Sequence, residues 1–212
     1  LTGYTSTIRR RKYSRNSMAK TVKTRPESFC FIDVESYSDV DVDYGAVNYF
    51  ASAKAGIHCI CYKIDDGDTR RIWLGGKIKP LPKELLAHKG YFVAHNWFFE
   101  WCAFRRFYPT TRLAEIEPWL CTAAIARRYH IAGSRAALDE VAIRCGAGST
   151  KLHEGKRLIA TYSYPRKDTG EFIPVPDADK QAWLDYCAHD VVSIHFCSEE
   201  QKKPNTSRHN SG

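Results

Sequence analysis

One eight-residue stretch, residues 29–36, constrains the fold of this chain more than any other. It reads Phe-Cys-Phe-Ile-Asp-Val-Glu-Ser, so an apolar run leads directly into two carboxylates separated by one valine. An apolar run rich in aromatic and β-branched residues predicts a buried strand. Side chains at i and i+2 of a strand point to the same face, so Asp33 and Glu35 would emerge together at its end. Two adjacent like charges repel, and a bound cation or a shared proton is the usual compensation.

A strand that simply ends in a polar loop is the alternative interpretation of Asp33 and Glu35, because Asp-x-Glu is common by chance.

The length and composition favour one globular domain: 212 residues, of which 43% are hydrophobic and 26% charged. No stretch approaches the ~18 uninterrupted apolar residues of a membrane span, so we expect no membrane association. The eight cysteines include no Cys-x-x-Cys pair, which favours reduced, buried thiols in an intracellular protein.

The net charge of +8 is concentrated at the N-terminus, where residues 1–28 contain eight Lys or Arg and a single Glu. We therefore predict a basic, disordered tail at 1–28, one folded domain at 29–200 and a polar, disordered tail at 201–212. Met18 is the only methionine and opens a segment that resembles a natural start. Residues 1–17 are accordingly interpreted as non-native; a phosphate-binding arm and an organellar transit peptide are the open alternatives.

Hydrophobic patterning predicts an antiparallel strand meander followed by alternating strand and helix. Residues 149–177 are expected to be a basic loop that contains aromatic residues, a composition that suits single-stranded nucleic acid as well as any solvated loop. The expected strands are residues 29–36, 45–52, 57–64, 70–74 and 91–94, and the expected helices are residues 80–88, 97 onward, 119–129, 136–145 and 178–200.

Two further acids are expected to face the interior. Glu100 lies at the start of the helix that follows residues 91–94, and its neighbours are almost all large and apolar. A first-turn Glu that complements the helix dipole is the alternative interpretation. Asp190 falls inside the apolar stripe of the last helix, four residues after Tyr186, so phenol and carboxylate lie on one face. An acid on a core-facing stripe is costly unless it is compensated.

Four carboxylates from three distant segments would carry a charge near −4 if they converge. Divalent cations would then be required, and hard oxygen ligands select Mg²⁺ or Mn²⁺ over zinc. Two such ions about 4 Å apart form the clamp used for phosphodiester hydrolysis. The sequence therefore predicts a two-cation site.

The arrangement resembles the DEDD exonuclease superfamily, and within it the proofreading 3′→5′ exonuclease domain of phage-type family A DNA polymerases. Three motifs match in order: Phe-Ile-Asp-Val-Glu at 31–35, His-Asn-Trp-Phe-Phe-Glu at 95–100 and Tyr-Cys-Ala-His-Asp at 186–190. The connecting residues 119–123 and 155–159 also resemble that branch. The likeness covers residues 29–197.

The resemblance implies roles for individual residues. Asp33 would bridge both metals, Glu35 and Asp190 would complete one ion's site, and Glu100 would hold the other ion. Tyr186 would orient or deprotonate the attacking water, which makes this the tyrosine subtype. Asn96 and Phe99 would position the 3′-terminal nucleotide, with a core role as the alternative for Phe99.

The resemblance further implies an α/β, ribonuclease-H-like fold: a mixed five-stranded sheet flanked by helices. It implies a metal-dependent 3′→5′ exonuclease that converts DNA, mainly single-stranded 3′ ends, to nucleoside 5′-monophosphates. A DNA polymerase subunit or domain is the implied protein partner, and the chain is expected to be free-standing or detached from it. An RNA-trimming exonuclease similar to ribonuclease D and a non-catalytic nucleic-acid-binding module are the alternatives. The expected location is intracellular, cytoplasmic or phage-encoded, with organellar import left open.

Overall fold

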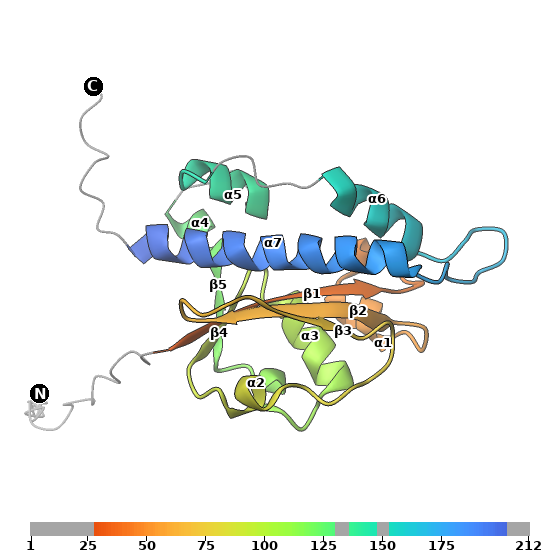
Figure 1. Cartoon of the computed structure of the whole chain (residues 1–212), viewed down its shortest axis with the longest axis horizontal. Coiled ribbons are helices and arrows are strands. Elements are labelled where there is room, and N and C mark those ends of the chain that lie inside the picture. The colour runs from red at the N-terminus through yellow and green to blue at the C-terminus, as the bar shows by residue number, and fades with distance from the viewer. Residues whose placement is uncertain (1–27, 130–135, 148–152, 203–212) are drawn as a thin grey trace, which may run out of the picture.

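The computed structural model describes residues 28–129, 136–147 and 153–202, and its centre is a five-stranded mixed sheet (Figure 1). The strand order is β3-β2-β1-β4-β5. The central strand is β1 (Phe29–Tyr37). It pairs antiparallel with β2 (Gly56–Ile64) and parallel with β4 (Tyr91–Ala94). The edges are β3 (Arg70–Trp73) and β5 (Trp119–Cys121). This is the ribonuclease-H-like sheet that we expected.

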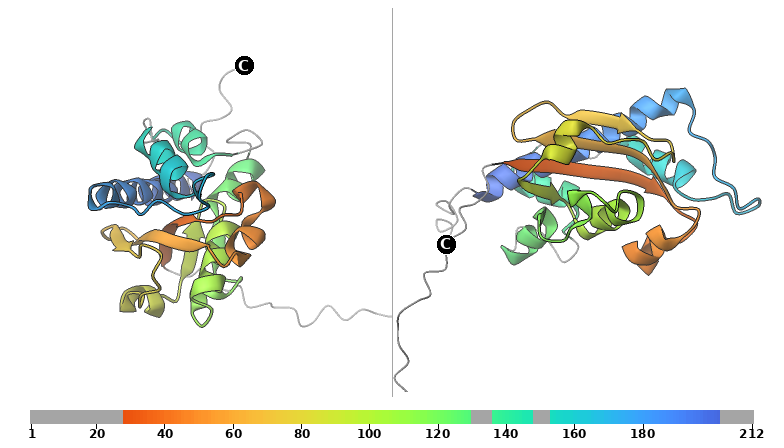
Figure 2. Two further views of the ribbon diagram at one scale, coloured as in Figure 1. Left: turned by 90° about the vertical axis from the view of Figure 1, so that its right-hand side faces the viewer. Right: turned by 90° about the horizontal axis from the view of Figure 1, so that it is seen from below.

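Helices cover both faces of the sheet, and the further views in Figure 2 show the same layering. One face is covered by a long C-terminal helix with shorter helices packed on it, and the other by helices from the first half of the chain. The first group is α7 (Asp177–Lys202), α4 (Thr122–Arg128), α5 (Leu138–Arg144) and α6 (His153–Tyr162), and the second is α1 (Ala46–Ala51), α2 (Lys83–Ala87) and α3 (Phe98–Phe107), with short 3-10 turns η1 (Val42–Tyr44) and η2 (Arg112–Ala114).

The alternation of β1 divides the interior into two main cores. Phe31 points into the core beneath α7, whereas its neighbour Ile32 points into the core beneath α3. Both side chains are almost completely buried. Because successive strand residues face opposite sides, an apolar run is the pattern of a strand covered on both faces. Asp33 lies two residues after Phe31 on β1, so its carboxylate also points to the face of the sheet that α7 covers.

The helix α7 is anchored by one apolar stripe, as its sequence predicts. Trp183, Cys187, Val191 and Ile194 are fully buried against the sheet or the helices around it. This stripe fixes the rotation of α7 about its own axis. No helix in the described part of the chain is both long and apolar enough to cross a membrane.

One expected strand is wrong. Residues 45–52 form the helix α1, not a strand, so the meander comprises β1, β2 and β3 alone. Tyr49 and Phe50 are buried and pack against Phe99 of α3, with ring centroids 5.4 and 4.8 Å from that of Phe99. Aromatic content favoured a strand, but the helix-to-helix contact decides the structure.

Two other segments also differ from expectation. The helix expected at residues 119–129 begins three residues late, because Trp119–Cys121 forms β5 and pairs with β4. Within the loop expected at residues 149–177, the structure contains the helix α6. Leu158 and Tyr162 lie four residues apart and pack with Trp183 of α7, a contact that local composition does not reveal.

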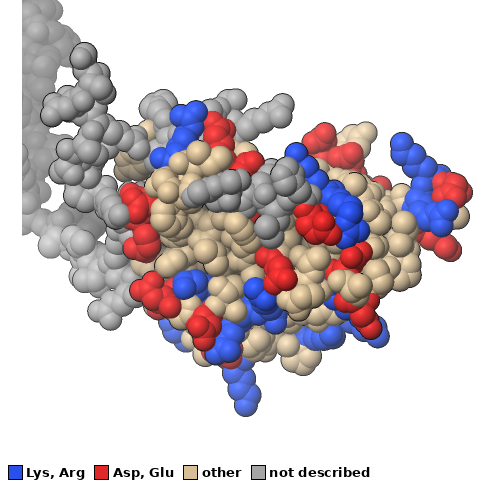
Figure 3. Space-filling model, turned by 45° about the horizontal axis from the view of Figure 1, so that its top comes forward, with Lys and Arg blue, Asp and Glu red and all other residues tan. Residues whose placement is uncertain are grey.

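The remaining described elements confirm the predictions within a few residues, and all eight cysteines are free. The last helix continues to Lys202, beyond the expected start of the C-terminal tail at residue 201. The tail predicted at residues 1–28, apart from Ser28, and most of that at 201–212 lie outside the described residues. On the face shown in Figure 3, basic and acidic side chains are interspersed rather than gathered by sign.

Candidate metal centre

Small side chains across the central strand pair leave room for the β1 carboxylates. Asp33 lies opposite Cys61 of β2, and Glu35 lies opposite Cys59. Directly opposed residues of an antiparallel pair have neighbouring side chains on the same face. A thiol fills less space than a Leu or Phe would, so both carboxylates fit beneath α7. The register shifts immediately after Glu35, between Glu35 and Ser36, where the strand leaves the regular ladder.

The carboxylates of Asp33, Glu35 and Asp190 form one cluster. One oxygen from each lies within 4.8 Å of the others, and each residue is partly buried. Asp190 reaches the cluster from α7 because the buried stripe sets the rotation of that helix. The structure therefore brings together acids that are more than 150 positions apart in the sequence.

The electrostatics of the cluster disfavour three unscreened charges. Burial is the main reason that the pKa of Asp33 is well above its usual range, and repulsion from Asp190 adds to it. Burial also raises the pKa of Glu35, followed by repulsion from Asp33 and Asp190. Among the described residues, neither Asp33 nor Glu35 has an ion-pair partner. A cation or added protons would relieve the repulsion.

Glu100 lies beside this cluster without belonging to its tightest group. It is the third residue of α3 and only 4% exposed. Its Oε2 atom is buried and has no hydrogen-bond partner, and the same is true of Oδ2 of Asp33. Burial, then repulsion from Asp33, raises the pKa of Glu100 well above normal. The dipole of α3 favours a carboxylate here but leaves that oxygen unsatisfied.

The donor set fits divalent cations with a preference for oxygen ligands. The four acids provide oxygen donors, and two buried carboxylate oxygens lack any hydrogen-bond partner among the protein atoms. Mg²⁺ and Mn²⁺ prefer such ligands, whereas zinc sites generally use Cys or His. The cysteines nearby are core residues: Cys59 and Cys61 are fully buried, and neither belongs to the described metal-binding group.

Tyr186 lies next to the cluster on α7, one helical turn before Asp190. Burial raises the pKa of its phenol, and repulsion from Asp190, Glu35 and Asp33 acts in the same direction. The phenol is therefore protonated in this environment and offers an O–H group. Gly155 of α6 packs directly on the ring: a Cβ atom at Gly155 would lie 2.3 Å from Cε2 of Tyr186.

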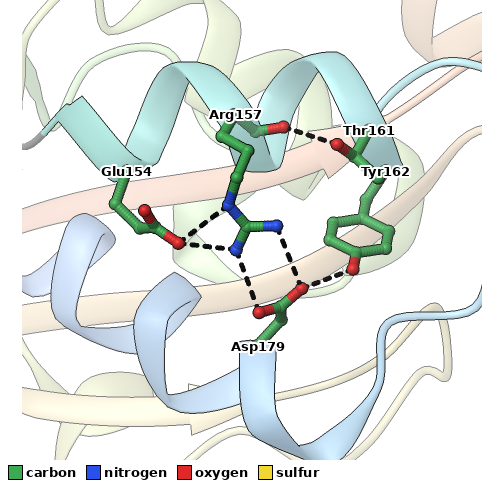
Figure 4. Close-up of polar contacts among 5 residues, drawn as sticks. All are labelled: Glu154, Arg157, Thr161, Tyr162 and Asp179. Carbon is green, nitrogen blue, oxygen red and sulfur yellow. Dashed lines mark hydrogen bonds and ion pairs between the residues drawn. The ribbon is translucent and has the colours of Figure 1, made fainter.

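A network of polar contacts fastens α6 to the start of α7 (Figure 4). Arg157 donates from Nε to Glu154 at 2.9 Å, and from Nη2 to Oδ1 of Asp179 at 2.9 Å. The hydroxyl of Tyr162 also donates to Asp179. The guanidinium and this hydroxyl hold the pKa of Asp179 below its usual range. The network keeps Gly155 against the ring of Tyr186.

Sequence reasoning did not assign a role to Cys187, Gly155 or this network. The thiol of Cys187 donates to the backbone carbonyl of Asp33 at 3.4 Å and thereby joins α7 to β1 at the cluster. A cysteine inside an apolar stripe carries no signal beyond burial. Gly155 and Arg157 fall in a segment that resembled the exonuclease branch, but only the packing of α6 against α7 shows what they contact.

The predicted substrate-binding residues occupy the turn before α3. Asn96 is exposed and has a left-handed φ of 69°, a conformation that Asn tolerates better than most residues. Its carbonyl accepts from the amide of Phe99 at 3.0 Å, which starts the helix that carries Glu100. Phe99 is partly buried and packs against Tyr49 and Phe50 of α1. This packing is the core role left open for Phe99.

Comparison with known proteins identifies a shared fold. No family model and no curated protein matches the chain. The solved structure of NrnC from Brucella melitensis superposes with a TM-score of 0.55 at 16% identity, covering 82% of this chain and 71% of that one. An apo form of a nuclease gives a TM-score of 0.48 at 18% identity, covering 82% of this chain and 70% of that one. B. melitensis NrnC with bound Mg²⁺ gives a TM-score of 0.48 at 16% identity, covering 82% of this chain and 71% of that one. The likeness to the first structure shows that the chain has the same ribonuclease-H-like fold as NrnC.

Proposed function

We propose that this protein is a metal-dependent 3′→5′ exonuclease that hydrolyses DNA to nucleoside 5′-monophosphates. The observation that carries the proposal is the cluster of Asp33, Glu35 and Asp190, within 4.8 Å of one another on a ribonuclease-H-like sheet. Glu100 adds a fourth buried acid, and the unpartnered oxygens of Glu100 and Asp33 supply ligands for cations.

Each site residue has a role that its position allows. Asp33, Glu35 and Asp190 would hold one divalent cation, and Asp33 with Glu100 would hold a second. When bound, these cations supply Lewis-acid activation of water and stabilise charge on the phosphate oxygens. Tyr186 would orient the attacking water through its hydroxyl, because its phenol is protonated beside the acids.

The preference for a 3′ end and for DNA rests on the three ordered motifs. Asn96 is exposed on the turn that leads to Glu100, where its amide could contact the terminal nucleotide. Phe99 would act indirectly, by supporting that turn from the core. A DNA polymerase as partner rests on the motif resemblance alone.

A direct assay tests the exonuclease proposal. Single-stranded DNA labelled at its 5′ end is incubated with the protein and Mn²⁺ or Mg²⁺. We expect a ladder that shortens from the 3′ end, abolished by EDTA and reduced at least ~1,000-fold by Asp33→Asn, which keeps the side-chain shape but removes the charge. The proposal fails if wild type and Asp33→Asn leave the DNA equally intact.

The same assay separates the two alternatives. An RNA oligonucleotide of the same sequence, run in parallel, distinguishes an RNA-trimming enzyme, because the acidic cluster would be the same for either substrate. A non-catalytic binding module would bind DNA without any rise in melting temperature on adding Mg²⁺ or Mn²⁺. We expect a rise for the wild type, because cations that bind only the folded protein stabilise it.

A further inference from the structure

A second candidate binding site lies on the α7 side of the sheet, beside the edge strand β3 and its neighbour β2. It is an open pocket of about 830 Å³. The walls come from the segment between α1 and β2, the end of β3 with the turn that follows it, and the segment that joins α6 to α7. None of the acids in the metal centre lines this pocket.

The lining is basic. Four lysines border the pocket and no carboxylate does: Lys54, Lys77, Lys79 and Lys180. Lys180 pairs with Asp177 outside the lining. Lys79 donates to the backbone carbonyl of Trp73 at 2.8 Å, and Lys54 approaches that of Gly170 at 3.4 Å. In the described parts of the chain, no carboxylate forms an ion pair with Lys54, Lys77 or Lys79.

Aromatic rings form the apolar part of the lining. Trp73 is partly exposed and stacks on His58, with centroids 6.1 Å apart and planes 13° apart. Phe172 is also partly exposed and packs edge-on against Tyr37 at 4.8 Å. His58 lies at the back: it is only 5% exposed, and burial lowers its pKa to about 4, so the lysines supply the positive charge.

The shape of the pocket depends on glycines that follow β3. Gly75 and Gly76 have φ values of 59° and 78°, a left-handed conformation that other residues adopt at a cost. A Cβ atom at Gly76 would lie 2.2 Å from the hydroxyl oxygen of Tyr37. The turn therefore approaches Tyr37 closely and carries Lys77 to the rim of the pocket.

The pocket lies close to the metal centre along two elements. Tyr37 lies two residues after Glu35 on β1. Lys180 precedes Tyr186 by six residues on α7, a separation of roughly 9 Å along the helix axis. The metal centre and the pocket are thus built on the same two elements, β1 and α7.

We propose that this pocket binds one nucleotide. The lysines would contact its phosphate, and Trp73 and Phe172 would contact its base. The rings of Trp73 and Phe172 are partly exposed, and Nζ of Lys180 already lies 5.9 Å from the centroid of Trp73. Cations beside partly exposed aromatic rings match the chemistry of a nucleotide, because every base has a π-face and every linkage a negative charge. The source is either a nucleotide of the substrate strand away from the scissile bond or a free nucleoside monophosphate. The identification as a nucleic-acid site rests on the proposed exonuclease function.

Binding without catalysis tests the proposal. The full chain is titrated into a fluorescein-labelled ten-residue oligothymidylate in EDTA and at about 150 mM salt, where the acidic cluster repels phosphate and screening weakens the contribution of the basic N-terminal segment. Lys54→Glu with Lys77→Glu should weaken binding at least ~10-fold and lower the salt-dependence slope by about 1.4, since each lost phosphate contact contributes about 0.7 for single strands. The matched control is Lys83→Glu with Lys89→Glu, the same charge change at exposed positions outside the pocket.

A second variant tests the aromatic contact. Trp73→Leu should weaken oligonucleotide binding by about 5- to 100-fold, the range for loss of one stacked base. Circular dichroism and the melting temperature report whether it folds; if it does not, Phe172→Leu replaces it, since Phe172 lies on a loop. A competition experiment distinguishes the two sources of the nucleotide. Thymidine monophosphate should displace the labelled oligonucleotide if the pocket binds a free nucleotide, and should not displace it if the pocket binds only a nucleotide within a strand.

Three outcomes would overturn the proposal. Pocket and control variants could bind the oligonucleotide equally well, inorganic phosphate could displace the oligonucleotide as effectively as thymidine monophosphate does, or oligoglutamate could compete as strongly as unlabelled oligonucleotide. These outcomes are independent of catalysis. If the exonuclease assay fails but the lysine substitutions in the pocket still weaken binding, only the proposed activity is refuted. If the protein cleaves DNA but the same substitutions leave binding unchanged, only the proposed nucleotide site is refuted.

Discussion

Glu100 illustrates how much one buried carboxylate can reveal. A Glu in the first turn of a helix is ordinarily explained by the helix dipole. In this protein, however, Glu100 is 4% exposed and one of its oxygens has no partner. Burial and Asp33 both raise its pKa. In the absence of cations, ionised Glu100 therefore destabilises the fold. A bound cation would offset this buried negative charge.

Replacing Glu100 by Gln should stabilise the metal-free protein. The substitution keeps the shape of the side chain and removes a buried charge, so we expect a higher melting temperature in EDTA. A gain of about 1 kcal/mol would appear as ~2–4 °C in a domain of this size. Calorimetry with and without Mn²⁺ measures both states; the increment produced by Mn²⁺ should shrink in the variant. Glu117→Gln, at an exposed position before β5, is the control.

The pH dependence of stability follows from the same raised pKa values. In the metal-free fold, Asp33, Glu35 and Glu100 hold protons at pH values where the unfolded chain, with pKa values near 4, has lost them. The free energy of unfolding therefore falls as the pH rises from ~4 through the folded-state pKa values. Urea unfolding in EDTA between pH 4.5 and 8 should show this fall, and saturating Mg²⁺ should reduce it. A fall unaffected by Mg²⁺ would contradict cation binding at these acids.

At the scale of elements, α6 shows why a short helix can matter to a distant site. It contributes no acid to the cluster, yet Gly155 lies against the ring of Tyr186 and Arg157 connects the helix to Asp179 of α7. These contacts fix how closely α6 approaches α7. The position of Tyr186 therefore depends on a segment that composition alone predicted to be a loop.

Gly155→Ala should lower activity despite the helix propensity of alanine. Propensity predicts a gain of about 1 kcal/mol for this change in a helix interior. The new Cβ, however, would lie 2.3 Å from Cε2 of Tyr186, so the ring or the helix must move. We expect kcat to fall by up to about 100-fold, the effect of misplacing a catalytic group by roughly 1 Å.

The readout that distinguishes positioning from unfolding is the rise in melting temperature on adding Mn²⁺. It should persist in Gly155→Ala, because the acids that hold the cation do not move with α6. Lys156→Ala, at the adjacent exposed position, should behave as wild type in both measurements. Equal kcat values for Gly155→Ala and Lys156→Ala would refute the positioning role.

For the whole molecule, the sheet and its two main cores are built from residues 29–194 of the described part of the chain. Deleting residues 1–27 removes a net charge of +7. We expect the melting temperature to stay within about 2 °C of the full chain, because the strands of the sheet begin at Phe29, after the deleted segment. Binding of single-stranded DNA should weaken mainly below 50 mM salt, where screening is weak. A loss of folding on deletion would contradict a domain at 29–200.

Sequence patterning predicted the elements whose own residues carry the signal. The apolar run of β1, the stripe of α7 and the acids on both are visible in one dimension, since burial on a face imposes a period of 2 or 3.6. The short helix α1 and the three-residue strand β5 were missed because neither is long enough to establish a period. Contacts with Phe99 and with β4 determine their structure.

The sequence by itself determined that four acids and a tyrosine lie on elements of an α/β fold, because their residue types and order are local properties. Only the tertiary structure decided that Asp33, Glu35 and Asp190 lie within 4.8 Å of one another while Glu100 lies beside them. It also placed Gly155 on Tyr186 and gathered four lysines around one pocket, which Trp73 also lines. These distances join segments far apart in the chain, and they are set by packing across the sheet, to which no local pattern responds.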